Sequence, residues 1–149
     1  MSLKRIETLT SRTAEWTCIS RALSSVEPPE TCYKSDDHLA VLLLPKFLRY
    51  LIHIPWVRRY FSGVAAPEGM YEYVIARTKY IDAVFREALA DRVAQIVILG
   101  AGFDTRALRL QDVSAMTKFF ELDIHITQNA KIRQYKKRGL HIPANLVFV

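Results

Sequence analysis

The sequence has 149 residues, half of them hydrophobic, and a formal net charge of +6 at pH 7. This length suffices for one domain with a sizeable core, and the composition excludes disordered, fibrous and disulfide-dense proteins. The small basic excess is compatible with an anionic partner but does not require one. Cys18 and Cys32 lack the spacing of a zinc site, so we expect no metal and two free thiols. The first twenty residues carry no signal-peptide pattern, and we expect a cytoplasmic protein.

The first part of the chain is predicted to form a helical cap. Apolar residues at helical spacing predict a helix over 4–23, and paired prolines predict a loop over 25–35. Residues 39–57 are almost long enough to span a membrane, but basic side chains and two prolines interrupt them. We therefore expect short helices over a pocket and no membrane contact. Residues 1–69 form this N-terminal cap or lid in our interpretation.

Residues 70–149 carry the pattern of an α/β domain. A continuous apolar stripe predicts a long helix over 70–91. Arg77 and Asp82 lie off this stripe, so neither is needed for packing. The uncharged, β-branched run 96–99 predicts a strand buried on both faces of a parallel sheet. Further strands are expected at 118–122 and 146–149, with a helix over 124–138 between them.

A glycine turn follows the first strand. Gly100, Ala101 and Gly102 allow a tight turn and the close approach of a ligand, and Asp104 is a suitable N-cap for a helix that follows. Strand, turn and helix together resemble the ligand-binding corner of a Rossmann-like unit. Asp123 ends the second strand, 21 residues after Gly102, where an acid can accept hydrogen bonds from ribose hydroxyls.

Two nucleotide-like ligands fit this corner, a dinucleotide or S-adenosylmethionine. A dinucleotide places its pyrophosphate on the helix N-terminus, where this chain has Asp104, and Thr105 replaces the third glycine of G-x-G-x-x-G. A carboxylate repels a pyrophosphate but tolerates a cationic sulfonium. The corner therefore favours S-adenosylmethionine.

The segment 131–138 carries five basic residues and could be a nucleic-acid patch. Tyr135 is the only aromatic residue among them, so a solvated helix face is the better interpretation and we expect no nucleic-acid partner.

Residues 97–109, VILGAGFDTRALR, resemble the cofactor loop of the leucine carboxyl methyltransferase family, which includes bacterial O-methyltransferases of the polyketide type. Other matching features are the segment 11–14, the pattern Arg77-Thr78-x-x-x-Asp82, and residues 121–123 followed by Lys131. The resemblance covers nearly the whole chain. Members of the family continue well beyond this length, so the chain resembles their N-terminal half.

The resemblance implies an S-adenosylmethionine-dependent O-methyltransferase on a Rossmann-like sheet that is truncated after the third strand. In this family Gly100 would line the cofactor, Asp123 would bind its ribose, and Arg77 would pair with the methionine carboxylate. Arg12 is a looser candidate for a basic residue near the cofactor. The adenine-binding segment and much of the acceptor pocket would lie in the second half.

The acceptor is expected to be a carboxylate or hydroxyl of a small molecule or peptide C-terminus. A carboxylate needs no general base, whereas an alcohol or phenol does, and we assign no catalytic residue. The alternatives are an NAD(P)-dependent oxidoreductase and a non-catalytic interaction module. Arg77 could also be solvated, and Asp104 and Asp123 could simply cap helices. The strand at 96–99 would be an open sheet edge, which a second copy or further chain would cover.

Overall fold

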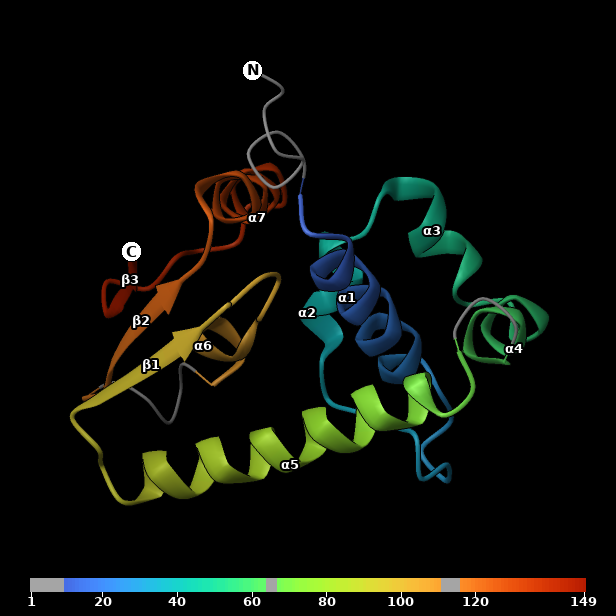
Figure 1. Ribbon diagram of the computed structural model, residues 1–149, viewed down its shortest axis with the longest axis horizontal. Helices are drawn as coiled ribbons and strands as arrows, with labels where there is room; N and C mark the ends of the chain where they lie inside the picture. Colours follow the sequence, from blue (N-terminus) through green and yellow to red (C-terminus); the bar gives the residue numbers. More distant parts are fainter. Residues whose placement is uncertain (1–9, 64–66, 111–115) are drawn as a thin grey trace.

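The computed structural model describes residues 10–63, 67–110 and 116–149 (Figure 1). Five helices precede the first strand in this part of the chain, and strands and helices then alternate. In order, the elements are α1 (Arg12–Ser25), α2 (His38–Leu43), α3 (Lys46–Leu51), α4 (Pro55–Gly63), α5 (Met70–Ala90), β1 (Gln95–Leu99), α6 (Arg106–Arg109), β2 (Lys118–Leu122), α7 (His125–Lys137) and β3 (Leu146–Phe148).

The three strands form a parallel sheet in the order β1-β2-β3. Ile96 pairs with Phe119 and Ile98 with Glu121, while Phe119 also pairs with Leu146 on the far side of β2. The predicted strands are thus confirmed, almost to the residue. β1 lies at the edge of the sheet, as we expected from the order of the strands.

Helices cover one face of this sheet. On that face Phe119 of β2 stacks on Phe85 of α5, with ring centroids 6.4 Å apart. Glu121, two residues further along β2 and on the same face, forms an ion pair with Lys131 of α7. On the opposite face Val97 and Leu99 are 55% and 76% exposed. The prediction that β1 is buried on both faces is therefore wrong, because no described element packs against the second face.

The N-terminal helices pack against the side of the sheet domain. Figure 1 shows α3 and α4 at the end remote from the strands, with α5 running from them to β1. The most apolar segment forms three short helices rather than one, as predicted, since Pro45 and Pro55 stand before α3 and open α4. No helix in the described ranges is long and apolar enough to cross a membrane.

The helix that we predicted over 4–23 begins later in the structure. Part of that range lies outside the described residues, but Ser11 is the N-cap of α1, and its hydroxyl accepts a hydrogen bond from the Ala14 amide at 3.3 Å. A side-chain oxygen at this position satisfies an amide that has no partner within the helix, which fixes where the helix starts. Thr10, just before it, is not helical.

Two charged side chains are buried, although we predicted that Asp82 is not needed for packing and that Lys131 lies on a solvated helix face. Asp82 of α5 is 3% exposed and Lys131 of α7 is 1% exposed. Each has an oppositely charged partner: Arg106 lies 2.7 Å from Asp82, and Glu121 lies 2.5 Å from Lys131. A buried charge is tolerated when it is paired and hydrogen-bonded, and the partners here come from other elements of the fold.

Candidate functional site

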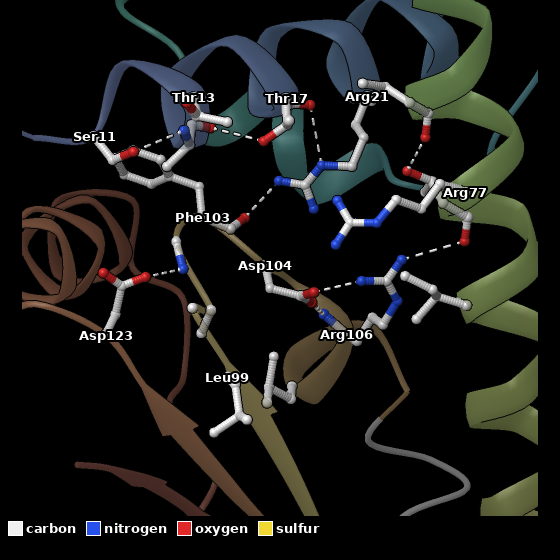
Figure 2. A pocket seen from close by; sticks show the side chains of 18 of the residues that line it. Ser11, Thr13, Thr17, Arg21, Arg77, Leu99, Phe103, Asp104, Arg106 and Asp123 are labelled. Carbon is white, nitrogen blue, oxygen red and sulfur yellow. Dashed lines mark hydrogen bonds and ion pairs between the residues drawn. The ribbon is translucent and has the colours of Figure 1, made fainter.

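One cleft of about 800 Å³ lies where the start of α1, the middle of α5 and the turn after β1 meet. Figure 2 shows this region, with α1 above the turn and α5 beside it. All seven residues that the sequence nominated for a cofactor line the cleft: Arg12, Arg77, Gly100, Ala101, Gly102, Asp104 and Asp123. They come from four segments of the chain, so the fold brings together what the sequence only suggested.

The glycine turn adopts a backbone conformation that favours glycine. Gly100 and Gly102 have φ angles of 63° and 51°, in the left-handed region. A Cβ on Gly102 would stand 3.0 Å from the Cβ of Ala14, whereas one on Gly100 would meet nothing within 4 Å. The turn is thus pressed against α1 at Gly102 and open at Gly100.

Asp123 connects the end of β2 to the glycine turn. Its Oδ2 accepts a hydrogen bond from the Gly102 amide, and its Oδ1 accepts one from the Ile124 amide at 2.7 Å. The side chain remains partly exposed at the cleft. Each carboxylate oxygen can accept more than one hydrogen bond, so acceptor capacity remains for a ligand hydroxyl.

Asp104 is not an isolated charge. Its Oδ1 accepts a hydrogen bond from the Arg106 amide at 2.8 Å, and its Oδ2 forms an ion pair with the guanidinium of the same residue. Thr105 occupies the N-cap position of α6, so the predicted cap is displaced by one residue, although the Asp104 carboxylate still holds an amide at the start of that helix. Burial alone would raise the pKa of Asp104, but Arg106 and Arg21 outweigh that effect and lower it, so the carboxylate stays ionised.

The pairing with Arg106 changes the sequence argument against a dinucleotide. A carboxylate that is neutralised by an adjacent guanidinium repels a pyrophosphate less than a free one does. The charge on Asp104 therefore discriminates between the two ligands less strongly than its position in the sequence indicated.

Behind the cleft lies a network of buried charges that the sequence analysis missed. Asp37, the N-cap of α2, forms ion pairs with Arg21 at 3.0 Å and with Arg109 at 3.3 Å. Arg21 also donates a hydrogen bond to the Phe103 carbonyl in the turn at 2.8 Å. No periodicity could have indicated this network, because its members lie tens of residues apart and meet only in the folded chain.

Arg77 extends from α5 toward the cleft, beside Asp104 and Arg21 in Figure 2. It lines the cleft and is exposed, and within the described residues no hydrogen bond or ion pair engages it. Arg12, at the start of α1, is likewise exposed at the rim. Arg77 is therefore available to an anionic group in the cleft.

Comparison with known proteins identifies the family. A family model described as leucine carboxyl methyltransferase matches residues 14–149, which include all the cleft residues named above except Arg12. The chain belongs to the leucine carboxyl methyltransferase family. Its three-stranded parallel sheet with flanking helices is consistent with the fold of a methyltransferase.

The relatives carry names of one kind. A protein of Mycobacterium sp. (strain KMS), named "Putative S-adenosyl-L-methionine-dependent methyltransferase", is 34% identical over 108 residues, which cover 70% of this chain and 39% of the relative. A similarly named protein of Mycolicibacterium smegmatis is 52% identical over 71 residues, which cover 48% of this chain and 22% of the relative. Another, from Frankia alni, is 44% identical over 50 residues, which cover 34% of this chain and 17% of the relative. These matches span well under two thirds of each relative.

Proposed function

We propose that the cleft binds S-adenosylmethionine and that the chain is the cofactor-binding part of an O-methyltransferase with a Rossmann-like sheet. The observation that carries this proposal is the convergence of Arg77, the glycine turn and Asp123 on one cleft, in a chain of a methyltransferase family. The strand order supports it, since in a Rossmann-like sheet the first strand has the second and third on one side of it.

Each group matches one part of the cofactor. The turn Gly100–Ala101–Gly102 presents backbone without bulky side chains, which allows the ligand to approach closely. Asp123 supplies charged acceptors for the ribose hydroxyls, and Arg77 supplies a planar fork of donors for the methionine carboxylate. Arg12 adds a second positive charge at the rim.

Methyl transfer from this cofactor is an in-line displacement. With the cofactor bound, the acceptor oxygen would form a bond to the methyl carbon as the carbon–sulfur bond breaks, and the electron pair of that bond would remain on sulfur. The cofactor supplies an activated electrophile, so the protein has to align the reactants and exclude water. We propose a carboxylate or hydroxyl of a small molecule or peptide C-terminus as the acceptor. A carboxylate would need no base from the chain, whereas a hydroxyl would have to give its proton to a general base.

Calorimetric titration with S-adenosylmethionine tests the proposal, and NAD serves as the comparison ligand. We expect saturable binding of the former and none of the latter. Replacing Asp123 with alanine should weaken cofactor binding by about 1–3 kcal/mol, the cost of losing charge-assisted hydrogen bonds. Asp91→Ala is the matched control, because Asp91 is an exposed residue at the far end of α5. Tight binding of NAD, or an unchanged affinity in Asp123→Ala, would overturn the assignment.

A further inference from the structure

Three groups on one face of α5 hold the side chain of Arg106. Thr78, Asp82 and Phe85 are spaced four and three residues apart, which places them on one stripe of a helix. Asp82 Oδ1 accepts a hydrogen bond from Arg106 Nε at 2.7 Å, and the Thr78 carbonyl accepts one from Nη2 at 3.2 Å. The guanidinium carbon lies 5.5 Å from the centroid of the Phe85 ring.

The remaining nitrogen of the guanidinium, Nη1, pairs with Asp104 at the cleft. Arg106 therefore links α5 to the segment that leaves the glycine turn, and Figure 2 shows it between the two. The Asp82 and Arg106 side chains are 5% and 6% exposed. Because every nitrogen is engaged, the orientation of the guanidinium fixes where the Asp104 carboxylate lies.

Asp82 has a second partner that reaches the N-terminal helices. Arg109 Nη2 lies 3.0 Å from both oxygens of Asp82, while its Nε lies 3.3 Å from Asp37. Three arginines and three aspartates are thus linked in the wall of the cleft and behind it, and their formal charges cancel: Arg21, Arg106, Arg109, Asp37, Asp82 and Asp104.

We propose that Asp82 is a positioning residue of the cofactor site, which acts through Arg106 to hold Asp104 and the glycine turn in the geometry that binds the ligand. This inference rests on the proposed function. A buried ion-pair network stabilises a fold no better than well-packed apolar side chains of similar volume would. What the network provides is a fixed direction for Asp104, since a forked guanidinium sets the angle as well as the distance of its partners.

Two substitutions break the link at different points. Asp82→Asn removes the charge that orients the guanidinium, and Arg106→Lys keeps the positive charge but cannot contact Asp82, Asp104 and the Thr78 carbonyl together. Asp36→Asn is the matched control. It removes the charge of the exposed Asp36 and with it the ion pair to Arg86 of α5, whose two atoms lie 3.0 Å apart. This ion pair also joins α5 to the N-terminal region, but neither residue lines the cleft.

Two measurements are made on each variant, at temperatures where circular dichroism shows it to be folded. Calorimetry gives the dissociation constant for S-adenosylmethionine, and hydrogen exchange followed by mass spectrometry gives the protection of amides 100–108. We expect Asp82→Asn and Arg106→Lys each to raise the dissociation constant at least tenfold, and the double variant to be within twofold of the weaker single one. Exchange over 100–108 should quicken while β2 and α7 stay protected. Asp36→Asn should change neither quantity.

The outcomes separate the positioning role from a purely structural one. A folded Asp82→Asn protein with unchanged affinity and unchanged exchange over 100–108 would overturn the inference and leave the proposed function intact. If Asp82→Asn does not fold, Arg106→Lys decides by the same two criteria. If the unaltered chain binds no S-adenosylmethionine, the proposed function fails, and the exchange pattern alone decides whether Asp82 positions the turn.

Discussion

Replacing Gly102 with alanine should destabilise the chain more than the same change at Gly100. Both residues have left-handed φ angles, and that conformation costs an alanine about 1–2 kcal/mol. At Gly102 the new Cβ also stands 3.0 Å from the Ala14 Cβ on α1, whereas at Gly100 it meets nothing within 4 Å. Overpacking a well-packed contact costs about 1–3 kcal/mol, so we expect about 2–5 kcal/mol in total for Gly102→Ala.

Gly100→Ala is the matched control, because it carries the backbone strain without the contact. Urea unfolding followed by tryptophan fluorescence gives the free energy of unfolding of each variant, and Trp16 on α1 reports on the helix that Gly102 contacts. The difference between the two variants isolates the packing of α1 on the turn. Equal losses of stability, or a larger loss for Gly100→Ala, would show that α1 does not press on the turn and would refute the geometry described for the cleft.

Three further predictions concern the buried pair, the thiols and the sheet edge. Burial raises the pKa of Glu121 above its ordinary value, and Lys131 offsets this only in part, so the folded state takes up a proton before the unfolded state does as the pH falls. The contribution of Glu121 to the free energy of unfolding should therefore decline as the pH rises from about 4.5, the ordinary pKa of a glutamate, through the raised pKa of the folded state. The measurement is the difference in stability between wild type and Glu121→Gln, and a difference that does not vary with pH would contradict this. Burial raises the pKa of Cys18 to about 11, whereas Cys32 is exposed. At pH 8 a thiol reagent should therefore modify only Cys32 in the folded chain and both thiols in denaturant. Rapid modification of Cys18 without denaturant would contradict this. The exposed Leu99 on the edge strand β1 should promote pairing of two copies, which light scattering would detect as a mass above that of the monomer. Leu99→Lys should lower that mass, and a stable monomer of the unaltered chain would contradict the prediction.

The elements that the sequence predicted well are those with local signals. The apolar stripe of α5 and the runs of β1 and β2 are visible within windows of a few residues, and the structure places them where expected. The glycine turn and Asp123 have a spacing that is set within one strand-helix-strand unit, from the end of β1 to the end of β2. These local features nominated Gly100, Ala101, Gly102, Asp104 and Asp123, whereas Arg77 and Arg12 were nominated through the resemblance to the family, and all seven residues line one cleft.

What the sequence could not predict depends on partners distant in the chain. Asp82 deviates from the apolar stripe of α5, and only the fold shows that Arg106, 24 residues later, neutralises it. Lys131 belongs to a basic run and is buried because Glu121 lies beneath it on β2. Leu99 is exposed because no described element packs on the second face of the sheet. The residues of an apolar strand do not by themselves show whether another element will cover it.

We propose that S-adenosylmethionine binds in the cleft between α1, α5 and the glycine turn. The most direct measurement is the perturbation of backbone amide chemical shifts in a ¹⁵N-labelled chain as S-adenosylmethionine is added. We predict saturable shifts at Gly100, Ala101, Gly102 and Asp123 and at Arg77 on α5, with none at the remote helices α3 and α4. Saturable shifts confined to other elements, or no saturable shifts at all, would contradict the claim.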